Sequence, residues 1–224
     1  MAETPPTSLL VRVRKLLGHI RRQFVVDTFD VFVRPVPAPG PFEPPPGYAF
    51  LWGTPVDVSR CDAFHTELDE RERAEGVQRL GLGHKLVLGQ QDGLIVFTMW
   101  VNPRNLNVPG LMKRRLAGQW FIYKAFTSPE HRGRKLYEAG MRFVLLEMAR
   151  LGLRELVGYA HVNKAVSRKG LAALTFQSAG RVYRVDIPFF ERSFLSKKLR
   201  AKFPEGLPRS GAVRAVTTST VPRS

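Results

Sequence analysis

Residues 127–135 have the sequence Thr-Ser-Pro-Glu-His-Arg-Gly-Arg-Lys and connect two segments of different periodicity. Before them, the apolar run that begins at Trp120 predicts a strand. After them, apolar residues recur at helical spacing from Leu136 to Leu151 and predict a helix. The first N–H groups of a helix have no partner within it, and the helix dipole places partial positive charge there. With its basic side chains, the junction therefore predicts a turn that binds phosphate or pyrophosphate.

In this setting the junction resembles the cofactor-binding motif of the GNAT superfamily (Gcn-related N-acetyltransferases), which has the pattern Gln/Arg-x-x-Gly-x-Gly/Ala. The approach to that motif is often Pro-Glu-x-Arg-Gly, and residues 129–133 match it. The motif itself is degenerate, because Lys135 and Tyr137 stand at its two glycine positions when the count starts from Arg132. A basic loop with a convenient glycine is the alternative interpretation.

The chain beyond the junction continues the resemblance. A strand is predicted over 155–161, and the helix predicted over 164–174 follows Asn163, as in the family. Ser167 is the small residue that the family has shortly after this asparagine, and Phe176 is the aromatic residue of the next strand. The order of these features agrees with that of the family.

The remaining segments complete the predicted fold. The apolar runs over 85–89 and 94–101 are separated by a turn with the pair Asp92-Gly93, which is a strong β-hairpin signal. Further predicted elements are strands over 48–52, 120–127 and 182–185 and a helix over 62–80. The predicted fold class is α/β, with a mixed, mostly antiparallel central sheet and crossover helices, similar to the acyl-CoA N-acyltransferases.

The resemblance implies that an acetyl, or another acyl, group moves from acyl-CoA to an amine acceptor by direct attack on the thioester. Acetyl-CoA is then the co-substrate, and no metal is required. In the family, strand backbone binds the pantetheine arm and the first helical turn binds the pyrophosphate. The corresponding residues of this chain are Ala125, Phe126, Thr127, Arg132, Gly133, Arg134, Lys135, Leu136, Tyr137, Asn163 and Ser167.

The sequence lacks the general acid that many members of the family have. That residue is a tyrosine in the helix after the asparagine, and its place falls at Gly170 or Leu171. Tyr159 and His161 lie on the preceding predicted strand and alternate to the same face, so they are the candidate catalytic residues. A histidine with an ordinary pKa of about 6.5 suits proton transfer. The alternative to a catalytic role is that His161 is a core histidine whose ring nitrogens already have hydrogen-bond partners.

Proline recurs between residues 35 and 47, which excludes a helix or a strand interior and predicts a linker. The predicted domain organisation follows from this boundary. It comprises a basic amphipathic N-terminal extension (1–34), a Pro-rich linker (35–47), a GNAT-like acyltransferase domain (48–190) and a basic, partly disordered C-terminal tail (191–224).

The chain has 224 residues, a net charge of +16 and a sequence pI of about 10.7. With a single cysteine and no predicted signal peptide or spanning helix, we expect a cytoplasmic protein. Residues 9–24 predict a helix with an apolar stripe beside cations, typical of a membrane-surface helix or of a helix packed on the domain. One hypothesis is that this helix and the basic segment 189–203 rest on the inner face of an anionic membrane. The acceptor would then be an envelope-related amine.

The excess positive charge also supports a different class of function, a non-catalytic basic module on a degenerate GNAT scaffold. Such a module would bind nucleic acid or an anionic membrane. The chain has no recognition-helix, RNP-type or zinc-finger signature, so only nonspecific, salt-dependent binding of nucleic acid is expected. A small-molecule amine acceptor is the main expectation, and the sequence indicates no oligomeric state.

Overall fold

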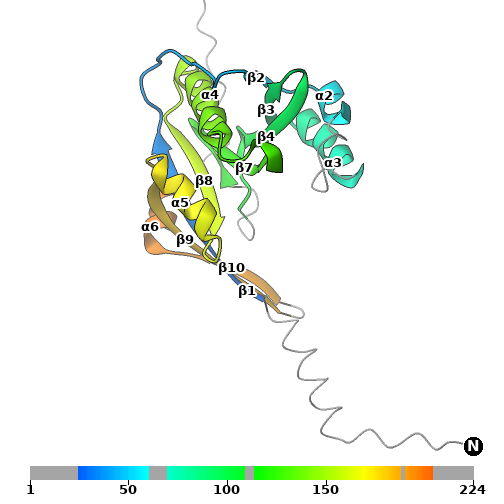
Figure 1. Cartoon of the computed structure of the whole chain (residues 1–224). Helices are drawn as coiled ribbons and strands as arrows, with labels where there is room; N and C mark the ends of the chain where they lie inside the picture. Colours follow the sequence, from blue (N-terminus) through cyan, green and yellow to red (C-terminus); the bar gives the residue numbers. More distant parts are fainter. Residues whose placement is uncertain (1–24, 61–69, 109–113, 188–189, 204–224) are drawn as a thin grey trace, which may run out of the picture.

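The computed structural model describes residues 25–60, 70–108, 114–187 and 190–203 (Figure 1). Their main feature is an eight-stranded sheet with the order β10-β9-β1-β8-β7-β4-β3-β2. Neighbouring strands are antiparallel except β7 and β8, which are parallel. The strands are β1 (Val25–Pro35), β2 (Ala49–Trp52), β3 (Lys85–Gln91), β4 (Leu94–Asn102), β7 (Gln119–Thr127), β8 (Glu155–His161), β9 (Gln177–Ile187) and β10 (Phe190–Leu195). This mixed, mostly antiparallel sheet confirms the predicted fold class.

Helices cover both faces of the sheet. Phe121 and Ile122 are adjacent in β7, so they point to opposite faces, and they lie in different hydrophobic cores. The helices α4 (Leu136–Arg150) and α5 (Ala165–Ala173) pack on the Ile122 face, and α6 (Lys197–Lys202) packs on the Phe121 face. The other elements are α2 (Pro55–Arg60), α3 (Glu70–Gly81), the 3-10 helix η2 (Pro129–His131) and the separate strand pair β5 (Asn105–Leu106) and β6 (Arg114–Arg115).

The turn between β3 and β4 is the predicted hairpin. Asp92 and Gly93 have φ angles of 51° and 78°, and a type I′ turn needs positive φ at both central residues. The strands predicted over 120–127 and 155–161 are β7 and β8, and the helix predicted over 136–151 is α4. These predictions are confirmed because the local pattern and the tertiary contacts favour the same structure.

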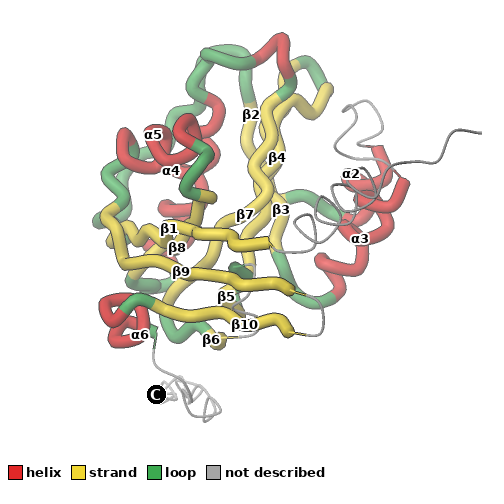
Figure 2. Tube along the Cα trace, turned by 90° about the horizontal axis from the view of Figure 1, so that it is seen from below, coloured by secondary structure: helices red, strands yellow, loops and turns green. Residues whose placement is uncertain are grey.

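The predicted N-terminal boundary is wrong from Val25 onward. β1 lies inside the sheet, where it pairs with β8 on one side and β9 on the other. Val31 faces Tyr159 and Gly180 across these pairings, and its side chain is fully buried. Figure 2 shows β1 beside β9, with β10 on the far side of β9. Residues 25–34 therefore belong to the domain, because the sheet would be divided without them.

The Pro-rich segment also contacts the domain. Phe42 packs edge-on against Phe50 and Phe143, with ring centroids 5.9 and 5.7 Å apart. The Val36 N–H donates a hydrogen bond to the Arg154 carbonyl oxygen at 2.9 Å. Proline does prevent regular structure here, as expected, but the segment forms a strap across α4 and not a free linker.

The C-terminal part differs from its prediction in a similar way. Residues 190–195 form the edge strand β10 and residues 197–202 form α6, where the sequence predicted a basic tail that begins at residue 191. The Ser196 hydroxyl accepts a hydrogen bond from the Leu199 N–H and so caps α6. Among the residues that the structure describes, no helix is long and apolar enough to cross a membrane. The helix predicted over 9–24 lies outside the described residues.

Thr175 ends α5 in a left-handed backbone conformation, with φ 60°. Its N–H donates to the Ala172 carbonyl at 3.0 Å, and the Phe176 N–H donates to the Leu171 carbonyl at 3.1 Å. These two bonds form a Schellman motif, in which glycine is the preferred residue at this position. A β-branched residue is strained in the left-handed region, so Thr175 stores strain at the end of α5.

We predict that Thr175→Gly raises the free energy of unfolding by about 0.5–1 kcal/mol, because the relieved strain exceeds the entropy cost of glycine. Urea unfolding of the full chain measures the change. Thr28→Gly in β1 is the matched control, since it has the same entropy cost without the relief and should destabilise the protein. A loss of stability in both variants would contradict the prediction.

Candidate functional site

β7 and β8 separate part-way along their length and open the sheet. They pair only through Gln119–Glu155, Trp120–Leu156 and Phe121–Val157. Beyond these pairs, β7 stays paired with β4 as far as Thr127, and β8 stays paired with β1 as far as His161. Each strand thus follows its outer neighbour, and the strands of the two halves run in clearly different directions (Figure 2).

A β-bulge accompanies the separation. The register of β7 against β4 shifts between Thr98 and Trp100, and Lys124 in this part of β7 has a φ of 46°. A bulge bends its strand and increases the local twist, and bulges are common beside active sites. We infer that the bulge directs the second half of β7 away from β8.

A cavity of about 800 Å³ occupies the opening. Its walls come from the second halves of β7 and β8, from the start of α4 and from the first turns of α5. The lining residues are Phe29, Met99, Ile122, Tyr123, Lys124, Ala125, Phe126, Thr127, Arg132, Tyr137, Gly158, Tyr159, Ala160, His161, Lys164, Val166, Ser167, Gly170 and Leu171.

The cavity brings together part of the predicted site. Among the predicted residues, it gathers Ala125, Phe126, Thr127, Arg132, Tyr137, Tyr159, His161 and Ser167. Gly133, Arg134, Lys135, Leu136 and Asn163 are not among its lining residues. Sequence analysis missed Phe29, Tyr123 and Lys124. Phe29 was assigned to the extension, and a period-two pattern shows neither a bulge nor the separation of two strands.

The turn before α4 has the backbone that a glycine-rich turn needs. Gly133 and Lys135 both have left-handed backbones, with φ angles of 77° and 58°. Lys135 thus adopts, at the first glycine position of the motif, a conformation that glycine favours. No atom lies within 4 Å of a Cβ built on Gly133, so the turn is open on that side.

Arg134, within this turn, is held by Tyr48, the residue that directly follows the strap. Its Nη1 donates a hydrogen bond to the Tyr48 hydroxyl at 3.0 Å, and this hydroxyl lies 3.0 Å from His131 Nδ1. Tyr48 is buried, and its ring also packs edge-on against His131. Tyr48 therefore links the strap to the cationic turn, although the two are far apart in the sequence.

Tyr137 lines the cavity from the first turn of α4. Burial raises the pKa of its phenol, so the hydroxyl stays protonated at neutral pH. A Cβ built on Gly170 would lie 3.9 Å from the Tyr137 ring. The ring therefore lies next to the position on α5 where the resemblance leaves a tyrosine missing.

His161 has partners at both ring nitrogens. Its Nδ1 accepts a hydrogen bond from the Asn163 N–H at 3.1 Å, and its Nε2 lies 3.4 Å from a carboxylate oxygen of Asp27. The ring packs edge-on against Phe29, with a centroid distance of 5.3 Å. This geometry favours the alternative of a satisfied histidine at the end of β8. Burial raises the pKa of Tyr159, whose phenol is therefore neutral as well.

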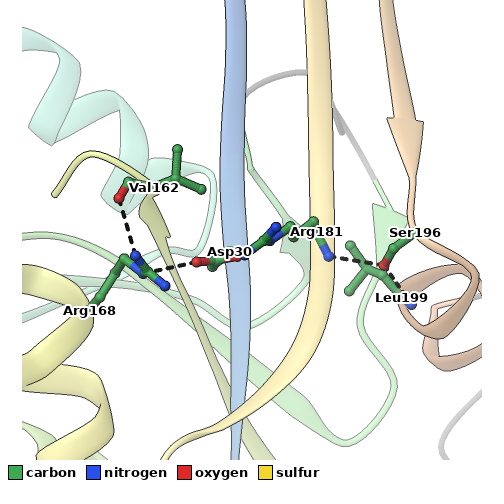
Figure 3. A network of polar contacts seen from close by, with 6 residues as sticks. All are labelled: Asp30, Val162, Arg168, Arg181, Ser196 and Leu199. Carbon is green, nitrogen blue, oxygen red and sulfur yellow. Dashed lines mark hydrogen bonds and ion pairs between the residues drawn. The ribbon is translucent and has the colours of Figure 1, made fainter. Parts of the chain in front are cut away.

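A buried carboxylate fixes α5 beside the cavity (Figure 3). Asp30 in β1 is 5% exposed, and its two oxygens lie 2.9 Å from Arg168 Nε and 2.7 Å from Arg181 Nε. Arg168 belongs to α5 and also donates to the Val162 carbonyl at 3.3 Å. The Arg181 N–H donates to the capping hydroxyl of Ser196 at 3.0 Å. Asp30 thus connects the helix that lines the cavity with β9 and α6.

The described residues contain no group of three or more His, Cys, Asp or Glu side chains that could hold a metal ion. The polar atoms of the cavity come from hydroxyls, basic side chains and backbone. The arrangement is suited to an elongated ligand with an anionic end at the turn before α4.

Comparison with known proteins identifies the fold. No family model matches the chain, and no curated protein matches its sequence. An acetyltransferase of the GNAT family from Novosphingobium aromaticivorans has a TM-score of 0.52 and 20% identity, over 72% of this chain and 65% of that one. A GCN5-related N-acetyltransferase from Sphaerobacter thermophilus has a TM-score of 0.51 and 18% identity, over 80% of this chain and 56% of that one.

A Drosophila protein is similar to the same degree, with a TM-score of 0.52 and 13% identity, over 81% of this chain and 58% of that one. The chain spans less than two thirds of each of these three structures. At such identities the likeness establishes the fold alone. The chain has the α/β fold of GNAT acetyltransferases.

Proposed function

We propose that this chain transfers an acetyl, or another acyl, group from acyl-CoA to an amine acceptor by direct attack on the thioester. The observation that carries the proposal is the opening between β7 and β8, whose cavity lies next to the cationic turn before α4. The fold shared with GNAT acetyltransferases supports it.

The residues present fit coenzyme A. Gly133 and Lys135 turn the backbone with left-handed conformations, and this side of the turn is open, which suits close approach of a pyrophosphate. Residues 125–127 of β7 and Ser167 of α5 would hold the pantetheine arm. Bound acyl-CoA supplies the activated acyl thioester.

The protein side of the reaction consists of positioning, exclusion of water and proton transfer. Met99, Ile122 and Leu171 give the cavity apolar walls, and holding two reactants in contact lowers a barrier by several kcal/mol. Tyr137 lines the cavity, and burial keeps its phenol protonated. Tyr137 is therefore our candidate for the group that protonates the departing thiolate, in place of Tyr159 or His161.

Calorimetric titration of the full chain with coenzyme A tests the proposal. We predict that the wild-type chain binds it and that Lys135→Glu weakens binding about 10- to 100-fold, because a charged contact contributes about 1.5–3 kcal/mol. Arg150→Glu is the matched control, since it makes the same charge change at the other end of α4, where the side chain is exposed.

The wild type and Arg150→Glu should bind coenzyme A equally well. No heat with coenzyme A or acetyl-CoA in the wild type would overturn the proposed function. Equal weakening in both variants would show that only overall charge matters, as in a nonspecific basic module. The anionic membrane surface suggested by residues 9–24 stays a hypothesis, because that segment lies outside the described residues.

A further inference from the structure

We propose that Tyr123 and His84 form the proton-accepting pair of this reaction, with Tyr123 facing the acceptor amine and His84 taking up the proton through the Tyr123 hydroxyl. The inference rests on the proposed acyl transfer and names residues that the family motif does not include. It gives the cavity a proton acceptor on one face of the sheet and a proton donor on the other.

Tyr123 is placed to meet a ligand. It lines the cavity from β7, one residue before the left-handed Lys124. Its ring stacks on Phe121, with centroids 5.9 Å apart and an interplanar angle of 8°, and Phe121 stacks in turn on Tyr159 at 5.6 Å. The Trp100 ring is also near the Tyr123 ring, with centroids 6.4 Å apart. These contacts hold the phenol in one orientation.

His84 is the hydrogen-bond partner of this phenol. His84 Nδ1 and the Tyr123 hydroxyl form a hydrogen bond, and the two rings meet edge-on with centroids 5.7 Å apart. His84 lies between the end of α3 and the start of β3, and its side chain is half-buried. It therefore contacts the cavity through Tyr123, and no pattern near His84 in the sequence indicates this.

The surroundings of His84 keep its ring neutral at pH 7. Burial first, and then the guanidinium groups of Arg79 and Arg104, lower the pKa of His84 below its ordinary value of 6.5. Arg79 lies over the Trp100 ring and is paired with Glu75 at 2.6 Å. Arg104 lies beside the preceding residue, since a Cβ on Gly83 would be 3.2 Å from its Cζ.

The side chain of Lys85, the next residue after His84, points away from this pair. The Nζ of Lys85 lies 4.8 and 5.0 Å from the ring centroids of Trp52 and Trp120, which belong to the Ile122 face. Among the described residues, the charges that act on the pKa of His84 are those of Arg79 and Arg104, and Arg79 is paired with Glu75. A neutral ring can accept a proton from the phenol at Nδ1 when Nε2 carries the hydrogen.

In the proposed step, the proton passes from the acceptor to the imidazole through the phenol. An N–H bond of the acceptor ammonium breaks, and its proton forms a new O–H bond at Tyr123. The original O–H bond of Tyr123 breaks at the same time, and its proton forms an N–H bond at His84 Nδ1. The amine becomes neutral and nucleophilic, and the positive charge moves to the imidazole. Because burial, and then Arg79 and Arg104, disfavour an imidazolium, His84 afterwards loses a proton to water.

The geometry separates the two proton-transfer groups. Tyr123 packs against the cores of the Phe121 face, whereas Tyr137 packs against the core below α4 and α5. An acceptor that reaches Tyr123 therefore approaches from the face opposite to these two helices. His161 does not compete for the role of base, since Asn163 and Asp27 already engage its nitrogens.

Nitrogen NMR of the ligand-free full chain tests the pair without any substrate. We expect His84 as the Nε2–H tautomer, with Nδ1 accepting the hydrogen bond, and we expect its Nδ1 signal to move in Tyr123→Phe. The opposite tautomer, with the hydrogen on Nδ1, would overturn the proposal, because the phenol would then have no acceptor for its proton.

Thiol release from acetyl-CoA, with benzylamine as the acceptor probe, supplies the kinetic readout. His84→Asn keeps an amide that hydrogen-bonds to Tyr123 but takes up no proton, so we expect kcat to fall about 100-fold with an unchanged KM for acetyl-CoA. The kcat of Tyr123→Phe should fall by a similar factor. The kcat of the double variant should fall no further, because the two residues act as a unit. Tyr183→Phe, on β9 outside the cavity, is the control and should retain wild-type kcat.

The wild-type kcat should be constant above pH 6.5 and fall at lower pH, since a protonated Nδ1 accepts nothing, and this decline should vanish in His84→Asn. A kcat within threefold of wild type in His84→Asn would overturn the proposal. If benzylamine is not a substrate, the tautomer of His84 in the nitrogen NMR experiment tests the proposal by itself. Failure of the wild type to bind coenzyme A would instead overturn the proposed function, whatever the tautomer of His84.

Discussion

Replacing Gly180 by alanine is expected to lower the free energy of unfolding by about 4 kcal/mol, from about 1–3 kcal/mol of backbone strain and a similar cost of overpacking. Gly180 has a φ of 135°, which side chains rarely adopt. A Cβ there would lie 2.4 Å from Ser196 Oγ and 2.8 Å from Leu199 Cβ. Domains are stable by only about 5–15 kcal/mol, so this one change removes much of the total.

The large effect of Gly180→Ala follows from the way α6 packs on the sheet. Leu199 and Phe203 are buried and pack with Val31, Phe121 and Val157 on the face opposite to α4. The helix α6, which Phe203 follows directly, reaches this position only because residue 180 has no side chain. If α6 is displaced, the core under β1 and β8 loses its cover, and the loss extends to the strands that border the cavity.

Gly152→Ala is the control for the strain alone. Gly152 has a φ of 66°, and no atom lies within 4 Å of a Cβ built on it. We expect the free energy of unfolding of this variant to fall by about 1 kcal/mol. Urea unfolding of Gly180→Ala and Gly152→Ala separates the cost of backbone strain from the cost of the contacts that a Cβ makes with α6. Equal losses in the two would contradict the docking of α6 on Gly180.

The second large effect is expected for Asp30→Asn, which should lower the free energy of unfolding by about 2–3 kcal/mol. Removing one partner of a buried ion pair costs about 3–5 kcal/mol, and the expected value is lower because the Arg168 and Arg181 side chains are 42% and 51% exposed. The variant keeps the shape of the side chain but leaves two guanidinium groups near a neutral amide. Chemical denaturation measures the loss.

The two arginines allow stability to be separated from ligand binding. Arg168→Gln and Arg181→Gln each remove one partner of Asp30, but only Arg168 belongs to α5, which lines the cavity through Ser167 and Gly170. We expect both variants to be less stable, and only Arg168→Gln to bind coenzyme A about 3- to 10-fold more weakly. Equal binding by both variants would show that Asp30 stabilises the fold without positioning α5.

Local patterns were sufficient for elements that are determined by residues close in the sequence. The Asp92-Gly93 turn, the helix from Leu136 and the strand over 155–161 were all predictable, because turn chemistry and periodicity act over a few residues. The turn before α4 was also predictable as a cationic connection between a strand and a helix. Its left-handed Lys135 was not, since glycine is the residue that usually signals such a backbone.

Other features depended on contacts between distant residues. β1 looked like part of an extension, because nothing local shows that a strand enters the middle of a sheet. The pair of His84 and Tyr123 spans 39 residues, and that of Asp30 and Arg181 spans 151. The His161 ring appeared to be a candidate base until its contacts with Asn163 and Asp27 were seen.

The amino-acid sequence thus determined the α/β class, the hairpin and the cationic turn, since hydrophobic periodicity and turn residues act locally. Tertiary packing determined where β7 and β8 separate and which side chains meet in the cavity between them. The physical reason is that β4 and β1 hold these strands on their outer sides. The width of the opening is therefore a property of the whole sheet.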